Sequence, residues 1–285
     1  MAERKTKTAG KNYQIGLVGV GFVGGAVRKY FESKKYKIYL YDKYKKLGSP
    51  EEVNEADVVF VATPTPFLAK GGFDGSSVEA AIKLLKAPKI VVVKSSVVPG
   101  FTDSLQKKYP RHKILFNPEF LREVSAYEDF IHPDRQIIGV TARSTDAADI
   151  VMRLLPKAPY QAVMQAAEAE MVKYMANSFL ALKVVFANEF FDICGSLNID
   201  YRPVKEAVVK DGRIGNSHFD VFLDSYRGYG GSCFPKDVNA IIQLAASKKA
   251  KPDLLLAMRG INRGLLKSSG LTEEHFLKNR HKKKH

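Results

Sequence analysis

The stretch QIGLVGVGFVGGAVRKYF, residues 14–31, runs from an apolar segment through a glycine-rich turn into a helical pattern. Gly19, Gly21 and Gly24 have the spacing G-x-G-x-x-G at that turn. The first glycine makes the tight turn, the second lets a pyrophosphate approach the backbone, and the third lets the helix pack on the strand. The stretch therefore predicts the start of a dinucleotide-binding fold. The alternative is a glycine turn made only for packing.

A carboxylate closes the next predicted strand, KIYLYD, at residues 37–42. Asp42 lies about 20 residues after the glycines, where a carboxylate accepts hydrogen bonds from an adenosine ribose. A 2′-phosphate would be repelled there, so we expect NAD rather than NADP. Lys43 beside Asp42 weakens this distinction.

Apolar strands alternate with helical patterns as far as Met164. Strands are predicted at 57–66, 89–100, 112–120, 135–140 and 160–164, and helices at 76–87 and 145–155. This alternation is typical of a Rossmann-type α/β fold with a doubly wound parallel sheet.

After Met164 the pattern becomes entirely helical. One long helix is predicted over 165–196, and further helices at 203–211, 237–249 and 252–266. We therefore expect a basic arm at 1–11, a Rossmann domain at 12–164, an all-helical domain at 165–270 and a basic tail at 271–285.

Composition excludes several classes of protein. The hydrophobic fraction of 45% is ordinary for a soluble globular chain. No apolar run approaches the ~20 residues of a membrane span, and the first residues are polar, so we expect neither membrane insertion nor secretion. Two cysteines are too few for a disulfide framework. We expect reduced thiols and a cytoplasmic protein without a metal site.

The formal net charge of +15 raises the possibility of nucleic-acid binding. The two ends, residues 1–12 and 278–285, hold +8 of this net charge, and the body between them is only mildly basic. Short charged ends are usually solvated tails. Nucleic acid is therefore an unlikely partner, and an anion contact at the ends is the alternative.

The segment GYGGSCFPKD, residues 228–237, places Cys233 between glycines and a charged pair. Glycines let a substrate approach the backbone, and Lys236 supplies positive charge that favours a thiolate. Such a thiol can attack an aldehyde, and oxidation of the adduct gives a thioester that water hydrolyses. From spacing alone, a buried inert cysteine is the favoured alternative, with Asp237 as a helix cap. Cys194, in the apolar segment FFDICGSL, is expected in the core.

Two further polar patterns are ambiguous. Glu170, Lys173 and Asn177 share one face of the long predicted helix, either as a solvated stripe or as a site that steadies an oxyanion. In NPEFLRE, residues 117–123, Glu119 and Glu123 follow the end of a strand. They either perform acid–base chemistry or belong to a surface loop.

Taken in order, GLVGVGFVGG, ATPTP, KSSVVPG, NPEFLRE, AEMVKYMAN and GYGGSCFPKD resemble the nucleotide-sugar 6-dehydrogenase family, the UDP-glucose/GDP-mannose dehydrogenases. GGSCFPKD together with NPEFLRE is highly specific, and the resemblance covers roughly residues 12–266. It implies a four-electron oxidation of a sugar C6 alcohol to the carboxylate with two molecules of NAD. UDP-glucose, giving UDP-glucuronate, is the expected substrate. It also implies a homodimer whose core is the long helix, so that the helical domain is a dimerisation domain.

The resemblance assigns chemical roles to five residues. Cys233 would hold the thiohemiacetal and the thioester, and Asp237 would order the water and act in base catalysis. Lys173 would stabilise the alkoxide and Asn177 would help to position it. Glu119 would assist thioester hydrolysis.

Further residues follow from the same motifs. Ser96, where the family has threonine, is carried over as a catalytic and cofactor-binding residue. The expected cofactor-binding residues are Gly19, Gly21, Phe22, Val23, Gly24, Asp42, Thr63, Pro64, Ser96, Glu123 and Lys236. The expected substrate-binding residues are Glu119, Phe120, Leu121, Arg122, Lys173, Asn177, Arg213, Tyr229 and Gly230. Arg213 would reach the sugar nucleotide across a dimer contact.

Two departures from the family pattern bear on these expectations. Val124 replaces a glycine that often follows LRE. Family members continue into a third, nucleotide-gripping domain, whereas this sequence ends in a basic tail. We therefore expect either that the nucleotide end is held differently, for example by Arg280 and Lys282–Lys284, or that the substrate differs, or that activity is reduced.

Two other functions stay open at the level of sequence. A β-hydroxyacid dehydrogenase also pairs a glycine-rich NAD fold with a helical Lys-x-x-x-Asn pattern, but it uses no catalytic cysteine. A non-enzymatic dinucleotide-binding protein could contact nucleic acid through its basic ends. The sequence does not choose among UDP-glucose, GDP-mannose and UDP-N-acetylmannosamine as substrates.

Overall fold

The computed structural model describes residues 13–68, 72–222 and 225–278. Within them the chain forms two compact units. The first runs through Thr65 and resumes at Gly75–Glu170, and the second comprises Pro66–Asp74 and the chain from Met171 onward. The domain limits expected from the sequence, 12–164 and 165–270, stay a prediction. The expected arm at 1–11 lies outside the described residues, as does residue 279 onward.

The first unit is built on an eight-stranded sheet with the order β10-β9-β8-β7-β4-β1-β2-β3. The strands are β1 (Ile15–Val18), β2 (Ile38–Asp42), β3 (Leu47–Gly48), β4 (Val58–Val61), β7 (Ile90–Val93), β8 (Lys113–Phe116), β9 (Arg135–Val140) and β10 (Tyr160–Gln165). Neighbouring strands are parallel except at β2–β3 and β8–β9. The Rossmann-type fold expected from the sequence is confirmed, with a mostly parallel sheet.

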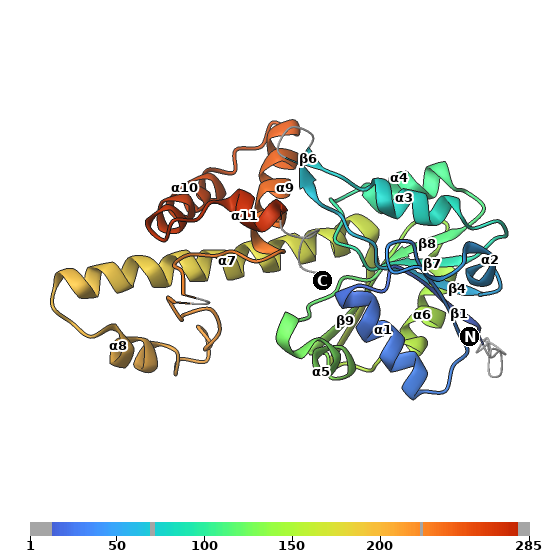
Figure 1. Ribbon diagram of the computed structural model, residues 1–285, viewed down its shortest axis with the longest axis horizontal. Helices are drawn as coiled ribbons and strands as arrows, with labels where there is room; N and C mark the ends of the chain where they lie inside the picture. Colours follow the sequence, from blue (N-terminus) through green and yellow to red (C-terminus); the bar gives the residue numbers. More distant parts are fainter. Residues whose placement is uncertain (1–12, 69–71, 223–224, 279–285) are drawn as a thin grey trace, which may run out of the picture. The chain divides into compact units, whose positions relative to one another are not determined.

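Helices cover both faces of this sheet (Figure 1). They are α1 (Phe22–Ser33), α2 (Pro50–Val53), α3 (Ser76–Lys83), α4 (Phe101–Lys108), α5 (Ala126–Ile131) and α6 (Ala148–Leu154). Residues of α1, α5 and α6 share one hydrophobic core with the sheet, while α3 and α4 lie on the opposite face. Because both faces are covered, β1 and β4 are buried at every position, which explains their uninterrupted apolar sequences.

Several strands end earlier than the sequence predicts. β7 ends at Val93 and β8 at Phe116, although the apolar patterns continue to residues 100 and 120. The remaining residues form the loops beyond the carboxyl ends of these strands, where Pro99 and Pro118 lie. Pro118 has no N–H for the sheet ladder, so pairing of β8 does not continue there, whereas β7 already ends six residues before Pro99. Neither α4 nor α5, which follow these loops, is predicted from the sequence.

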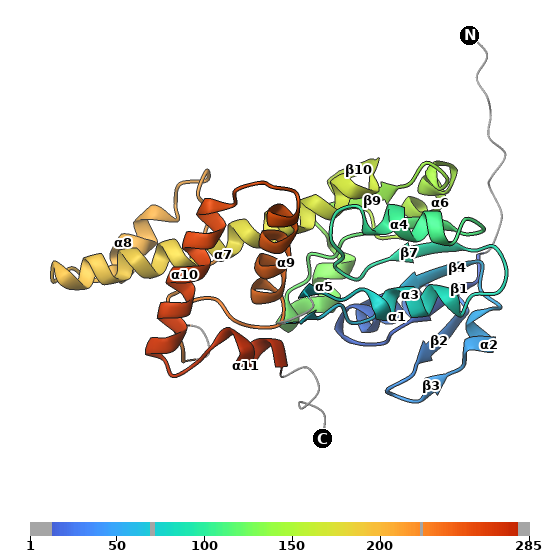
Figure 2. The ribbon, with the colours of Figure 1, turned by 90° about the horizontal axis from the view of Figure 1, so that it is seen from above.

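The second unit is mainly helical. Its helices are α7 (Ala166–Ser196), which begins in the first unit, α8 (Tyr201–Val208), α9 (Phe234–Ser247), α10 (Asp253–Ser268) and α11 (Glu273–Lys278). The hairpin of β5 (Phe67–Leu68) and β6 (Gly72–Phe73) also belongs to this unit, far from the helices in sequence. Figure 2 shows α9 and α10 beside α7.

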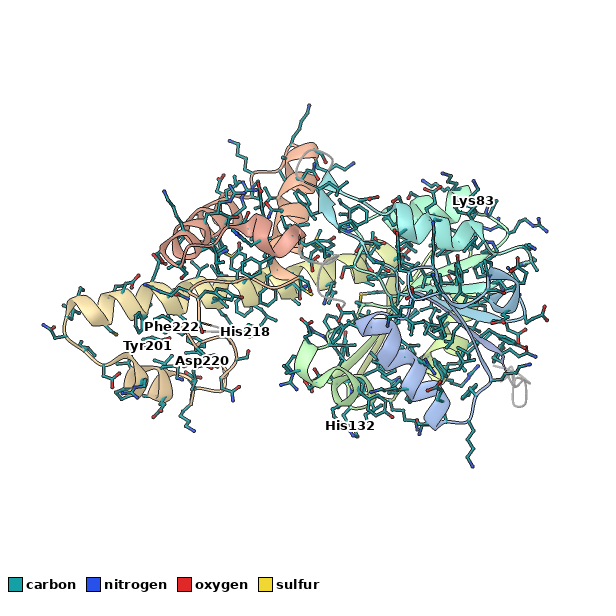
Figure 3. The ribbon with its side chains drawn as sticks, viewed as in Figure 1. Lys83, His132, Tyr201, His218, Asp220 and Phe222 are labelled. Atoms are coloured by element: carbon teal, nitrogen blue, oxygen red, sulfur yellow. The ribbon has the colours of Figure 1, made fainter. Side chains whose placement is uncertain are left out.

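Two hydrophobic clusters hold the helical unit together. One joins α7 to α9 and α10 through residues such as Val185, Val238 and Met258. The other joins α7 to α8 and the loop after it, where the Tyr201 hydroxyl donates to the Phe219 carbonyl at 3.0 Å. Figure 3 labels Tyr201 of α8 together with His218, Asp220 and Phe222 of that loop. Across the described residues, we find no helix whose length and apolar character would let it span a lipid bilayer.

Candidate functional site

The glycine turn lies where β1 passes into α1. Gly19 has φ +89°, and a Cβ on it would lie 2.6 Å from the Ala62 carbonyl oxygen. A Cβ on Gly24 would lie 2.0 Å from the Gly19 carbonyl oxygen, so these two positions exclude any side chain. Above Gly21 there is open space, and no side chain caps the start of α1. A phosphate could therefore approach the free N–H groups of this helix.

Asp42, the last residue of β2, contacts the same turn. Its Oδ2 accepts the Val20 N–H at 2.8 Å, and its Oδ1 accepts the N–H groups of Tyr44 and Lys45 at 3.0 Å. The Lys45 ammonium donates to the Val20 carbonyl, whereas Lys43 is exposed. Asp42 therefore lies where the sequence predicts it, on the glycine turn.

The loops after β4 and β7 are joined by hydroxyl groups. Ser95 Oγ donates to the Thr63 carbonyl and Thr65 Oγ1 donates to the Ser96 carbonyl, both at 2.7 Å. The Thr63 hydroxyl, beside Pro64, is buried and has no hydrogen-bond partner among the residues that the structure describes. An orphaned buried hydroxyl and the space above Gly21 fit a polar ligand such as the pyrophosphate or ribose of a dinucleotide. The exposed Phe22 and half-buried Val23 begin α1 at this edge.

The NPEFLRE loop follows β8 at the same edge of the sheet. Glu119 is buried, and its carboxylate accepts the Leu121 N–H at 2.9 Å. The Phe120 ring lies under the Arg135 guanidinium, 3.8 Å from it. These contacts hold the loop in one conformation, with Glu119 turned inward.

The next residues of this loop face outward. Arg122 donates from its N–H and guanidinium to Asp129, with Nη2 2.6 Å from Oδ1, and this pairing lowers the Asp129 pKa to about 2. Glu123 and Val124 are exposed in the short helical turn that follows. The predicted cofactor contact of Glu123 and substrate contacts of Phe120, Leu121 and Arg122 stay predictions.

In the helical unit, three of the predicted residues meet in one buried group. The Asn177 amide donates to Asp237 Oδ2 at 2.6 Å, and the Lys236 ammonium forms an ion pair with Oδ1 of the same carboxylate. All three side chains are buried, as is Lys173 one turn before Asn177 on α7. The Glu170, Lys173 and Asn177 face is therefore not a solvated stripe.

Cys233 stands next to this group, at the N-cap of α9. It is partly exposed, its carbonyl accepts the Asp237 N–H at 2.9 Å, and its sulfur lies 3.6 Å from Ser232 Oγ. Asp237 is thus in the first turn of α9 rather than at its cap. Cys194, by contrast, is 6% exposed within an apolar cluster, in the core as the sequence predicts.

The predicted substrate-binding residues of this unit differ in exposure. Tyr229 is buried, and its hydroxyl has no hydrogen-bond partner within the described parts of the chain. Gly230 lies under the Phe276 ring, which a Cβ would approach to 2.5 Å. Arg213 is on the surface, where its guanidinium pairs with Asp211. Their contacts with substrate stay predictions.

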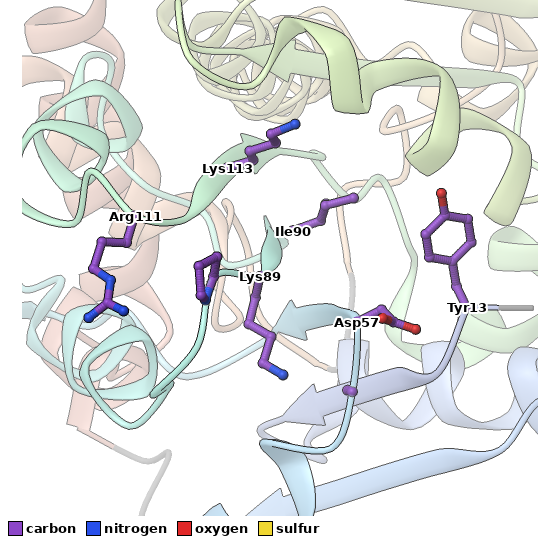
Figure 4. A pocket seen from close by; sticks show the side chains of 8 residues that line it. Tyr13, Asp57, Lys89, Ile90, Arg111 and Lys113 are labelled. Carbon is purple, nitrogen blue, oxygen red and sulfur yellow. The ribbon is translucent and has the colours of Figure 1, made fainter. Parts of the chain in front are cut away.

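A surface hollow of about 230 Å³ lies at the opposite edge of the sheet in the first unit. Figure 4 shows Tyr13, Asp57, Lys89, Arg111 and Lys113 around it, near the amino ends of β1, β4, β7 and β8. The ammonium groups of Lys89 and Lys113 are already bonded, to the Asn54 carbonyl and to Asp146. In open α/β sheets ligands bind at the carboxyl ends of the strands, so this hollow is not part of the candidate site.

Each unit also contains buried polar residues that the sequence did not single out and that hold loops carrying its own predicted site residues. In the first unit, the Lys94 ammonium donates to Asn117 Oδ1 at 2.5 Å and links the loops after β7 and β8. In the second, the Asn262 side chain bonds the backbone of Tyr229. A single asparagine inside an amphipathic helical pattern carries no signal that would have identified it.

Comparisons with known proteins agree with this arrangement. The NAD binding domain of the UDP-glucose/GDP-mannose dehydrogenase family matches residues 44–155, and the central domain of the same family matches residues 167–264. The glycine turn lies before the first of these ranges. One range thus falls in the sheet and its helices, and the other covers α7 to α10.

Individual relatives carry related names. The UDP-glucose 6-dehydrogenase AglM of Haloferax volcanii is 35% identical over 247 residues, which cover 79% of this chain and 56% of that protein. The UDP-glucose 6-dehydrogenase of Rickettsia prowazekii is 35% identical over 208 residues, covering 70% of this chain and 47% of that protein. The solved structure of a UDP-glucose dehydrogenase from Pyrobaculum islandicum gives a TM-score of 0.80 at 31% identity, covering 94% of this chain and 73% of that chain. The chain spans about half the length of the curated relatives it matches.

Proposed function

Because the chain belongs to the UDP-glucose/GDP-mannose dehydrogenase family, we propose that it oxidises the C6 alcohol of a nucleotide sugar to the carboxylate. UDP-glucose is the proposed substrate, since the relatives above are named for it. The observation that carries the proposal is the buried group of Asn177, Asp237 and Lys236 beside the partly exposed Cys233. A purely structural core does not need a buried ion pair and an amide next to a thiol.

The first unit contains the NAD-binding domain of the family. The glycine turn would hold the pyrophosphate on the N–H groups of α1, and Asp42 would accept hydrogen bonds from the adenosine ribose. Two further contacts are proposed, the buried Thr63 hydroxyl, which is unbonded within residues 13–68, 72–222 and 225–278, and Ser96 in the adjacent loop. NAD, when bound, supplies the acceptor for the hydrides that leave C6.

The residues of the helical unit would act on the sugar. Asp237, with a water, would take the proton of the C6 hydroxyl, and Lys173 and Asn177 would stabilise the oxyanion. The Cys233 thiolate would then add to the aldehyde carbon, forming a C–S bond while the carbonyl electron pair moves to oxygen.

The second oxidation leaves a thioester on Cys233. Water would add to its carbonyl carbon, assisted by Glu119, and the C–S bond would break to return the thiolate and release the acid. Overall, one alcohol and one water lose four electrons and yield the carboxylate, with no free aldehyde. The covalent bond to Cys233 retains the intermediate between the two oxidations.

We also propose a homodimer formed through α7. One face of this helix exposes apolar side chains at spacings of three, four or seven residues, and these residues are Met171, Met175, Phe179, Phe186, Phe190 and Ile193. This α7 stripe is about 100° wide, as in a helix that packs along another helix. Water-exposed rings at this density are unfavourable, so a partner surface is expected.

Stoichiometry tests the proposed reaction. With UDP-glucose in a nucleotide-sugar panel, we expect two NADH per sugar consumed, and Cys233→Ser should lose turnover or stop after one hydride. Cys194→Ser, which changes the other thiol in the core, is the control and should keep two NADH per sugar. One NADH per substrate together with an active Cys233→Ser variant would instead favour a β-hydroxyacid-type dehydrogenase.

A further inference from the structure

The loop that leads to Cys233 is bonded to α10 by an asparagine side chain. Asn262 is fully buried in that helix. Its Oδ1 accepts the Tyr229 N–H at 2.7 Å, and its Nδ2 donates to the Tyr229 carbonyl at 3.0 Å. One amide thus satisfies both backbone groups of a residue four positions before the thiol. We name residues 227–233 the thiol loop.

The backbone of the thiol loop is shaped for this contact. Gly228 has φ +84°, and a Cβ on it would lie 2.5 Å from Asn262 Oδ1. Only glycine allows both this left-handed conformation and so close an approach. At the end of the same helix, Ser269 Oγ accepts the Arg227 N–H at 3.2 Å. Two residues of the thiol loop are therefore held by α10.

The same helix also braces the chain after Cys233. Arg259 lies three residues before Asn262 and donates to Asn239 Oδ1 at 2.9 Å. Asn239 in turn donates from Nδ2 to the Pro235 carbonyl at 2.7 Å, in the first turn of α9. The backbone is thus held on both sides of Cys233 by side chains of α10, before it by Asn262 directly and after it by Arg259 through Asn239.

Both side-chain hydrogen bonds given for Asn262 within the described residues go to the backbone of Tyr229, in another segment of the chain. An asparagine within a helix lowers helix propensity relative to an apolar residue, so the core alone gives no reason for it. Between Tyr229 and Cys233 lie Gly230 and Gly231 in succession, with φ +72° at Gly231, and glycine restricts the backbone less than any other residue does. Without an anchor at Tyr229, the thiol would sample several positions.

We propose that Asn262 is a positioning residue for Cys233, which it acts on through the backbone of Tyr229. The inference rests on the proposed function, in which the thiol must meet a carbon atom held by other residues. A displacement of the reacting atom by about 1 Å can cost ~100-fold in rate. Asn262 touches no reacting atom and is not a catalytic residue.

The test is Asn262→Asp, which keeps the shape but replaces the Nδ2 donor by an oxygen facing the Tyr229 carbonyl. We expect kcat for nucleotide-sugar oxidation to fall at least ~10-fold. The rate of Cys233 alkylation by iodoacetamide, followed by peptide mass spectrometry, should change at least ~3-fold, while the buried Cys194 stays protected. Alkylation needs no cofactor or substrate, so it reports on the thiol directly.

Asn54→Asp is the matched control. Asn54 also bonds backbone groups, donating to the carbonyls of Pro50 and Leu84 and accepting the Lys86 N–H, but it lies in the first unit. It should lower the melting temperature without changing the Cys233 alkylation rate or kcat. If a general loss of stability caused the changes in Asn262→Asp, Asn54→Asp would show the same changes in alkylation rate and kcat.

The outcomes separate the two proposals. If Asn262→Asp folds and both rates stay within ~2-fold of the wild type, the positioning role is wrong. If Asn262→Asp fails to fold, Asn262→Ala replaces it, because alanine removes both hydrogen bonds without placing a carboxylate oxygen against the Tyr229 carbonyl. The same ~2-fold limits on kcat and on the alkylation rate then apply. If the wild type oxidises no nucleotide sugar, the proposed function fails, and the alkylation rates alone still decide the role of Asn262.

Discussion

At the scale of single residues, Asp237 joins an amide and an ammonium group in the candidate site. It is fully buried and accepts from Asn177 while paired with the Lys236 ammonium, itself 5% exposed. A buried charge that loses its partner is costly, whereas replacing both charges together is much less so. The carboxylate is therefore needed for the fold as well as for the proposed chemistry.

We predict that Asp237→Asn lowers the free energy of unfolding by about 3 kcal/mol, because it leaves the Lys236 ammonium buried without a counter-charge. Urea denaturation followed by circular dichroism measures this. The double variant Lys236→Met/Asp237→Asn should recover at least half of the loss. A single variant within about 1 kcal/mol of the wild type would contradict the prediction.

Glu170 is a second buried carboxylate, with a different role. It accepts the N–H groups of Gly100 and Thr102 at 2.6 and 2.9 Å and so caps the start of α4. Burial is the largest influence on its pKa and raises it from 4.5 to about 7, against the hydrogen bonds from Thr102 and Gly100, while the nearby Asp103 raises it further. The folded protein therefore holds a proton on Glu170 that the unfolded chain releases near pH 4.5.

The sign of the pH effect follows from this raised pKa. The contribution of Glu170 to stability is complete below pH 4.5 and is lost as the pH rises through about 7. Glu170→Gln removes the titration, so the stability of the wild type relative to this variant should fall by about 2–3 kcal/mol between pH 5 and pH 8. Urea titrations at several pH values measure the difference.

The control for this pH effect is Glu168→Gln on the same helix. Glu168 is exposed and accepts the Gln165 N–H at 2.9 Å. The difference in free energy of unfolding between Glu168→Gln and the wild type should stay constant over the same pH range. A flat difference for Glu170→Gln as well would show that burial does not raise the Glu170 pKa.

At the scale of elements, α7 is the helix whose sequence is most informative. The pattern predicts a helix over 165–196, and the structure has it from Ala166 to Ser196. A run of 31 residues without proline, and with its first glycine at Gly195, needs no tertiary information to be recognised. The hairpin of β5 and β6 gave no such signal, because strands of two residues have no period.

We predict that Phe186→Glu on the α7 stripe converts a dimer into monomers, weakening association at least ~100-fold, because an unpaired carboxylate would be buried in the interface. Sedimentation equilibrium measures the dissociation constant. The control is Val124→Glu, since Val124 is 96% exposed in the first unit and outside the stripe. A Phe186→Glu variant that associates as strongly as Val124→Glu would rule out the α7 stripe as the interface.

At the scale of the whole molecule, the stabilisation of the folded chain by a bound nucleotide tests the expected preference for NAD over NADP. A ligand that binds only the folded state at 100 times its Kd adds about 2.7 kcal/mol of stability. We predict that NAD raises the melting temperature and that NADP raises it much less, because Asp42 would repel a 2′-phosphate. Differential scanning calorimetry with each nucleotide measures both shifts.

Asp42→Ala should reduce the difference between the two nucleotides. Asp57→Ala is the control, because Asp57 also accepts a backbone N–H, from Gln14 at 3.0 Å, but lies at the opposite edge of the sheet. Equal shifts with NAD and NADP in the wild type would contradict the assignment of Asp42 to the ribose.

The sequence by itself determined the alternation of strands and helices, the glycine turn with Asp42, the length of α7 and the family. These features depend on periodicity or on residues close together in the chain, so they can be read without a fold. Only the tertiary structure decided which polar groups meet. Asn177 and Asp237 are 60 residues apart, and Tyr229 and Asn262 are 33 apart. Contacts of this kind arise when helices pack, and packing is determined by the shapes of many side chains together rather than by any local pattern.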